Sequence, residues 1–144
     1  MKDAYSNAFY GIVRDTQEKH GYNLPEHLEA YVVMLLAHHI DRPNFAPSNS
    51  FAETYLNLTT RTYTDAKTLG DSCLFVCGVF PTYGDRKGLK RSYYQNIGIG
   101  SYEMVAEIMH NDLFIQLATH FTFLSEFIEV VTHSTKGVQS NLFR

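Results

Sequence analysis

Residues 69–102, LGDSCLFVCGVFPTYGDRKGLKRSYYQNIGIGSY, decide how this chain folds. The carboxylate of Asp71 is followed by a wholly apolar run, residues 73–80, and then by a turn rich in proline, glycine and charged side chains. A helix that is apolar on every side is buried on every side. Helical periodicity resumes at Ser92, beyond the turn. The stretch therefore predicts a central buried helical hairpin, packed closely through Gly78 and Gly98.

Helical periodicity continues outward from this hairpin in both directions. Apolar residues recur at spacings of three and four in residues 5–20, 26–39 and 112–135, and a shorter helix is expected near residues 51–58. The aromatic and β-branched residues of 73–80 and 121–131 would also suit strands, but periodic runs of this length favour helices. The sequence predicts an all-α, single-domain bundle of about six helices over residues 1–144, with a loop at 42–50 and a loosely held tail at 137–144.

Composition and charge limit the classes of function that this protein can have. The chain has 144 residues, 44% of them hydrophobic, which is enough to bury one core without disulfides or metals. Its 12 basic and 15 acidic residues give a net charge of -3, and this balance argues against a general nucleic-acid binder. The one basic cluster fits a single anionic group or an acidic partner; it contains Arg86, Lys87, Lys90 and Arg91.

The lack of signal-peptide features at the start of the sequence and the spacing of the cysteines predict a reducing compartment. The first residues, MKDAYSNAFYGIV, lack the basic start and unbroken apolar run of a signal peptide, and the apolar runs are too short to span a bilayer. A cytoplasmic location without membrane attachment is expected. Cys73 and Cys77 stand four apart in a helical pattern, a spacing that suits a disulfide poorly. Both are predicted to be reduced, buried thiols.

Asp71 is the strongest candidate for a functional carboxylate. It stands where its helix changes from polar to wholly apolar, and a buried charge needs a partner. The nearest candidates along the chain lie beyond the turn, and the favoured interpretation is that Asp71 locks the hairpin through a salt bridge with Arg91 or a tyrosine hydroxyl. The functional alternative is that Asp71, Arg91, Tyr93 and Tyr94 line a polar pocket and form a binding site.

The helix after the turn contains candidate residues for a metal site and for a nucleotide site. Glu103, Glu107 and His110 lie on one helix face and include the Glu-x-x-His spacing of di-iron helical proteins, but no second copy follows. No cofactor is therefore expected, and these three residues remain an alternative metal site. Gly98 and Gly100 lack the context of a phosphate-binding loop, which favours close helix packing instead. His120 is predicted to be a hydrogen-bonded histidine on the core face of the last helix.

The central stretch also resembles a known family. It carries, in order, Leu69-Gly70-Asp71, Leu74-Phe75, Gly78, Phe80-Pro81, Tyr93-Tyr94, Gly98 and Ser101-Tyr102. This run is similar to the LGD, LF, G-x-FP, YY, G, (A/S)Y pattern of a family of small, uncharacterised bacterial helical proteins. The similarity covers about a quarter of the chain, and it implies a bacterial, cytoplasmic, helical protein without implying an activity.

Two classes of function follow from these observations. Ten tyrosines and ten phenylalanines, some of them in or beside loops, favour a protein partner or homo-oligomer. The first hypothesis is a non-catalytic helical interaction or regulatory protein that presents the turn at 81–90 to its partner. The alternative is a helical, di-iron-like metal enzyme that uses Glu103, Glu107 and His110, or a binder of a small ligand.

Overall fold

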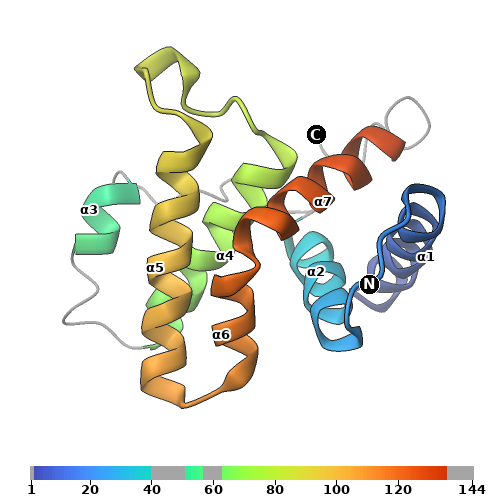
Figure 1. The fold of residues 1–144 in the computed structure, drawn as a ribbon, viewed down its shortest axis with the longest axis horizontal. Helices are drawn as coiled ribbons and strands as arrows, with labels where there is room; N and C mark the ends of the chain where they lie inside the picture. Colours follow the sequence, from blue (N-terminus) through green and yellow to red (C-terminus); the bar gives the residue numbers. More distant parts are fainter. Residues whose placement is uncertain (1, 40–50, 57–62, 136–144) are drawn as a thin grey trace.

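The computed structural model describes residues 2–39, 51–56 and 63–135, and all regular structure within these residues is helical. The predicted all-α fold is confirmed (Figure 1). The predicted loop at 42–50 and tail at 137–144 lie outside the described residues. The helices are α1 (Lys2–His20), α2 (Glu26–His39), α3 (Phe51–Leu56), α4 (Tyr63–Val79), α5 (Arg91–Met109), α6 (Asp112–Thr119) and α7 (Phe121–Thr135), with a 3-10 turn η2 (Asp85–Lys87) before α5.

The predicted central hairpin is formed by α4 and α5, which lie side by side in Figure 1 and make the most extensive helix–helix contact of the fold. The turn that joins them extends beyond the ends of the neighbouring helices. Every side chain from Asp71 to Val79 is buried, as expected for a segment that is apolar on every side. The core that encloses the hairpin includes Val32, Leu36, Leu74, Val105, Leu124 and Ile128, all without solvent exposure.

The outer helices follow the sequence pattern closely. The first helix ends at His20, and Gly21 has a φ of 75°, a left-handed conformation that glycine adopts without strain. Gln17 then fixes the entry to α2, because its side-chain oxygen accepts from the Leu24 amide at 2.8 Å and its nitrogen donates to Glu29 at 2.7 Å. The short α3 packs beside α5 on the opposite side of the hairpin from α1 (Figure 1).

The expectation of one continuous helix over 112–135 is wrong. The chain breaks at His120 into α6 and α7, whose axes are bent by 72°. His120 is the C-terminal cap of α6 and is exposed, so its predicted place on the core face is also wrong. The buried positions Leu117, Phe121, Leu124 and Ile128 continue at spacings of three and four across the bend, and His120 at the bend itself faces outward. Among the described residues no single helix is long and apolar enough to span a membrane. The bent pair of α6 and α7 has the length and apolar composition of a membrane span only when the two helices are taken together.

Glycines set the closest helix contacts, but not entirely as predicted. A Cβ on Gly98 would lie 2.9 Å from the Cβ of Cys73 and would overlap the ring of Phe121, so Gly98 brings α5 against both α4 and α7. Gly78 serves a different contact, because a Cβ there would overlap Ile128 of α7. The hairpin is therefore packed through Gly98, while Gly78 packs the hairpin against α7.

The two cysteines are free and buried, as predicted. Burial raises the pKa of the Cys77 thiol to about 12 and that of Cys73 well above its ordinary value. The neutral thiol is therefore the stable form in both cases, and neither cysteine has the lowered pKa of a nucleophile.

Candidate functional site

Asp71 is the centre of a buried polar cluster that joins three helices. Its Oδ1 atom accepts hydrogen bonds from the hydroxyls of Tyr31 and Tyr102, each at 2.6 Å, and its Oδ2 atom accepts from Lys67 Nζ at 3.0 Å. Tyr31 lies on α2, Lys67 and Asp71 on α4, and Tyr102 on α5. We call these four residues the Asp71 cluster. It satisfies a carboxylate that is only 9% exposed.

The two tyrosines of the Asp71 cluster act as permanent hydrogen-bond donors. Burial, reinforced by the negative charge of Asp71, raises the pKa of both Tyr31 and Tyr102 well above the ordinary value of 10.0. Their rings meet edge to face at a centroid distance of 6.3 Å, and the Lys67 ammonium lies 5.6 Å from the Tyr31 ring centroid. The cluster is thus one carboxylate held by two neutral hydroxyls and one cation.

Gly70 makes room for this arrangement. A Cβ at position 70 would lie 2.7 Å from Cδ1 and Cε1 of the Tyr102 ring, which is too close for two carbon atoms. The residue before Asp71 therefore has to be glycine if the Tyr102 hydroxyl is to reach the carboxylate. This explains the Gly-Asp pair of the central motif in packing terms.

A pocket of about 250 Å³ opens beside the Asp71 cluster, between α2 and α4. The face of α4 contributes polar groups to this pocket, and α2 contributes two histidines and an apolar edge. Of the cluster, Lys67 and Asp71 reach the pocket, whereas Tyr102 is fully buried behind it. The lining residues are Met34, Leu35, His38, His39, Thr64, Lys67, Thr68 and Asp71.

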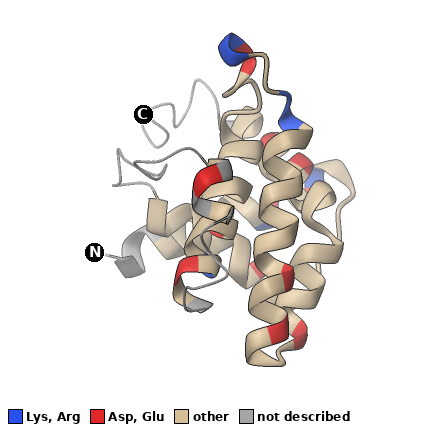
Figure 2. Ribbon diagram, turned by 90° about the vertical axis from the view of Figure 1, so that its left-hand side faces the viewer, with Lys and Arg blue, Asp and Glu red and all other residues tan. Residues whose placement is uncertain are grey.

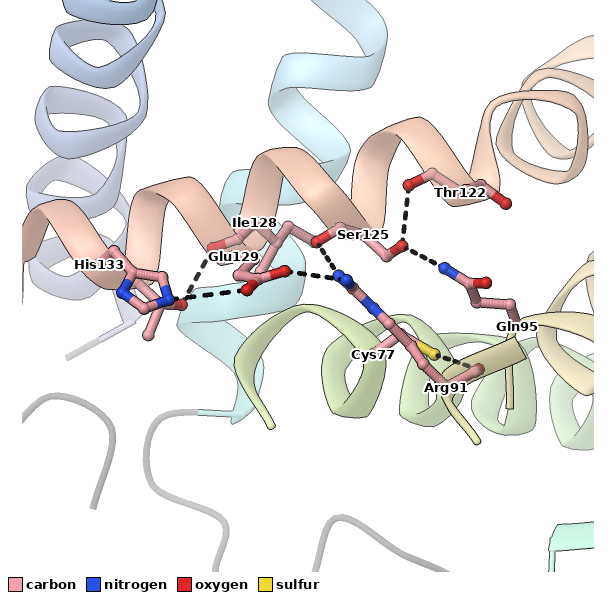
Figure 3. Close-up of polar contacts among 9 residues, drawn as sticks. Cys77, Arg91, Gln95, Thr122, Ser125, Ile128, Glu129 and His133 are labelled. Carbon is pink, nitrogen blue, oxygen red and sulfur yellow. Dashed lines mark hydrogen bonds and ion pairs between the residues drawn. The ribbon is translucent and has the colours of Figure 1, made fainter. Parts of the chain in front are cut away.

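Arg91 does not pair with Asp71, which corrects the first part of the predicted site. Its guanidinium instead forms an ion pair with Glu129 of α7 at 2.9 Å and donates to the Ser125 carbonyl at 3.1 Å. Figure 3 shows Arg91 pointing across to α7, with Gln95 donating to the Ser125 hydroxyl beside it. Arg91 therefore joins the start of α5 to α7 and takes no part in the Asp71 cluster.

Tyr93 and Tyr94 are also away from Asp71, and they support the turn instead. Their rings meet edge to face at 4.9 Å, and Tyr94 meets Tyr83 at 5.4 Å and Phe51 of α3 at 5.2 Å. A Cβ on Gly84 would lie 2.7 Å from the Tyr94 ring, so the turn rests directly on this tyrosine. The four residues predicted as one site thus lie at three separate places.

The turn itself is well ordered by backbone hydrogen bonds. The amides of Tyr83, Asp85 and Lys87 each donate to the carbonyl three residues earlier at 2.9–3.0 Å, and Leu89 donates to Gly84 at 3.0 Å. Gly88 has a φ of 72°, a conformation that ends η2 and that few other residues adopt readily. We call residues 80–90 the projecting turn. Its shape is fixed before any partner arrives.

The projecting turn exposes both cations and aromatic rings. Arg86, Lys87 and Lys90 are exposed and form no ion pair with any described residue, whereas the fourth member of the predicted cluster, Arg91, is engaged with α7. In Figure 2 the ribbon of the turn carries blue segments at one end of the molecule. Phe80 and Tyr83 are 36% and 44% exposed beside them.

A shallow hollow of about 460 Å³ lies at the base of the projecting turn. Its lining is mainly apolar and consists of Val79, Phe80, Pro81, Thr82 and Tyr83. The turn therefore combines a hollow that fits an apolar side chain with three cations that fit acidic ones.

The alternative metal site finds no support in the geometry. Glu103, Glu107 and His110 are all exposed on the last turns of α5. Within the part of the chain that the structure describes, no group of three or more His, Cys, Asp or Glu side chains is placed to hold a metal ion. The Glu-x-x-His spacing is thus present on a surface that offers no further ligands among these residues.

A scan against protein-family models, a search of curated proteins and a search of solved structures each find no match to this chain. The function is therefore inferred from the residues and geometry of the chain itself.

Proposed function

We propose that this protein is a non-catalytic interaction protein whose projecting turn docks an acidic segment of a partner protein. The observation that carries the proposal is the set of three exposed, unpaired cations beside the exposed Phe80 and Tyr83, on a chain whose net charge is -3. Such a local reversal of charge steers an acidic partner to one place on the surface.

The ordered backbone of the projecting turn supports a docking role. Binding costs free energy when loops and side chains must be ordered, and a surface that is fixed beforehand avoids part of that cost. The hydrogen bonds around Gly84 and the Tyr94 ring beneath it supply this order. Aromatic and arginine side chains are also the residues that contribute most at protein interfaces.

A protein partner fits the turn better than a membrane does. Lipid-binding basic segments carry four to eight cations, each worth about 1 kcal/mol near an anionic surface. The projecting turn has Arg86, Lys87 and Lys90, offset by the carboxylate of Asp85. The hollow beside them fits an apolar side chain of a partner segment.

A non-catalytic role is supported by the state of the most reactive groups. Asp71 already accepts three hydrogen bonds, so it is poorly placed to remove a proton from a substrate. The thiols of Cys73 and Cys77 are buried, and their raised pKa values favour the unreactive neutral form.

Fluorescence anisotropy with a short, dye-labelled peptide of alternating Glu and Leu tests the proposal. We expect binding that weakens with added salt, and no binding of the same peptide with Gln in place of Glu. The double variant Arg86→Gln/Lys87→Gln should bind at least about 5-fold more weakly, since two surface charges contribute about 1 kcal/mol together.

The matched control is Arg14→Gln/Lys19→Gln, which removes one arginine and one lysine from the exposed face of α1, where their side chains are 67% and 66% exposed. This control should bind the Glu–Leu peptide like the native chain. Equal loss in both double variants would refute the proposal, because it would show a response to net charge alone. Binding to anionic vesicles without binding to the peptide would assign the turn to a membrane instead.

The pocket beside the Asp71 cluster favours a second candidate function, the binding of a small polar ligand. Lys67 and Asp71 bring opposite charges to its lining, and the hydroxyls of Thr64 and Thr68 add hydrogen-bonding groups. A thermal-shift screen of small zwitterions and polyols, repeated with Thr68→Val, tests this candidate. A ligand that raises Tm of the native chain and not of the variant would support it, whereas equal shifts in both would refute it.

A further inference from the structure

A second exposed surface carries the opposite charge to the projecting turn. Glu103 and Glu107 lie one helical turn apart on α5, and Asp112 begins α6; all three are exposed. None of them forms an ion pair with another residue in the described ranges. Ile108 and Met109, which follow Glu107 in the chain, are 47% and 43% exposed. We call these five residues the acidic surface.

The acidic surface complements the projecting turn in charge. The projecting turn carries three exposed cations and the single carboxylate of Asp85, whereas the acidic surface carries three exposed carboxylates, and each also has two exposed apolar side chains. Unpaired charges beside exposed apolar groups are the composition expected of a docking surface with a complementary partner. The two surfaces thus have the chemistry to bind each other.

The two surfaces of one molecule are too far apart to meet. The projecting turn precedes Arg91 at the start of α5, whereas the acidic surface occupies its last turns and the start of α6. A helix of 19 residues is about 28 Å long at 1.5 Å per residue. In Figure 2 the ribbon carries blue segments at the end of the hairpin with the turn and red segments towards the other end. Any contact between the surfaces must therefore join different molecules.

We infer that the partner of the projecting turn is a second copy of this chain, which receives the turn on its acidic surface. The inference rests on the proposed function and names its partner. The contact uses different surfaces on the two copies, so each copy keeps one free surface of each kind. Contacts of this type propagate into a ring when the rotation closes and into an open filament when it does not.

Charge reversal on the full chain, read by sedimentation velocity over a range of concentrations, tests this inference. The native chain should self-associate in low salt and dissociate as salt is added. Arg86→Glu/Lys87→Glu and Glu103→Lys/Glu107→Lys should each lose association by at least about tenfold, because like charges then face each other. All four positions are exposed, so the fold should be retained in both variants.

The quadruple variant, which combines both charge reversals, tests the inference most sharply. The quadruple variant has the native net charge of -3, because two cations and two carboxylates exchange places, and it should self-associate again. A one-to-one mixture of the two double variants should associate again with the variants alternating, because the intact turn of one binds the intact acidic surface of the other and the two reversed surfaces also complement each other. Reversal of Arg14 and Lys19 on α1 should leave native association unchanged.

Three results would overturn the inference. The first is a native chain that stays monomeric at every concentration in low salt. The second is a quadruple variant that fails to associate, and the third is a mixture of the double variants in which no heterodimer forms. If the native chain is monomeric but still binds the Glu–Leu peptide through the projecting turn, the self-partner is wrong and the proposed function stands. If the native chain self-associates but does not bind the Glu–Leu peptide, the projecting turn is not a general docking site for acidic segments, and the proposed function is wrong in that respect.

Discussion

Replacing Tyr102 by Phe removes one hydroxyl from the Asp71 cluster and changes nothing else in its shape. The ring of Tyr102 is fully buried, and its hydroxyl donates to Asp71 Oδ1 at 2.6 Å. In the variant, Oδ1 keeps only the hydrogen bond from Tyr31, and no water can readily replace the lost donor at a site without exposure.

The expected cost follows from this geometry. A hydrogen bond to a charged group contributes about 1.5–3 kcal/mol, and the phenylalanine ring leaves almost no cavity term. We expect Tyr102→Phe to lower the free energy of unfolding by about 2 kcal/mol, which corresponds to a decrease in Tm of about 4–8 °C for a chain of this size. Tyr31→Phe should have a similar effect, and the double variant should cost more than the sum because Oδ1 then has no donor.

Urea unfolding followed by circular dichroism measures the effect, with Tyr93→Phe as the control. Tyr93 also lies on α5, is half-buried, and makes no hydroxyl hydrogen bond to a described residue. Its variant should stay within about 0.5 kcal/mol of the native chain. Equal stability of the Tyr102 and Tyr93 variants would refute the view that the Asp71 cluster holds α2, α4 and α5 together.

Further predictions concern packing, ion pairing and pH. Gly98→Ala should destabilise the chain by about 1–3 kcal/mol because its methyl group would overlap Phe121, whereas Gly11→Ala, with open space around it in α1, should stabilise by up to about 1 kcal/mol in the same urea experiment. Arg91→Met should lower stability by about 1 kcal/mol through loss of the Glu129 ion pair, an effect that high salt should reduce. Stability should fall as pH rises from about 9 towards about 12, since the unfolded thiols ionise near 9.0 while Cys77 in the folded chain ionises near 12; a flat profile of Tm against pH there would contradict this. In the native state Cys77 should resist alkylation at pH 8, and its rapid modification without unfolding would contradict its burial.

The hairpin was predictable because its signal is local. A run that is apolar on every side, followed by proline and glycine, has few solutions other than a buried helix and a turn. The reduced, buried state of Cys73 and Cys77 followed from the same run. The break at His120 was missed because no proline or glycine marks it, and because buried apolar residues recur at helical spacing on both sides of it.

The partners of Asp71 were missed for a geometric reason. Asp71 lies eight residues before the end of α4 at Val79, which places it about 12 Å below the turn. Its partner on an antiparallel α5 must lie at a similar depth, as Tyr102 does, and not at the turn with Arg91 or Tyr93. Tyr102 stands eleven residues after Arg91, and a helical side chain points back towards the N-terminus of its helix, so the Tyr102 hydroxyl reaches the depth of Asp71. The spacing of four would have indicated Lys67. No local pattern could have indicated Tyr31, which comes from a different part of the chain.

The sequence indicated only in part which residues of the basic cluster are exposed. Arg86, Lys87, Lys90 and Arg91 look alike as a cluster, but Arg91 is the first residue of α5 and faces Glu129 of α7. The other three precede the helix, in the turn, and form no ion pair with any described residue. Whether a basic residue of this cluster is paired or exposed therefore depends on whether it lies inside α5 or before its first residue.

The most direct test of the proposed function is a titration of the ¹⁵N-labelled full chain with the Glu–Leu peptide, followed by two-dimensional NMR. We expect the largest amide shifts on the projecting turn, at residues 80–90, and little change in the residues of the Asp71 cluster. Shifts that are absent at saturating peptide, or that concentrate in the pocket between α2 and α4, would contradict the assignment of the projecting turn as the docking surface.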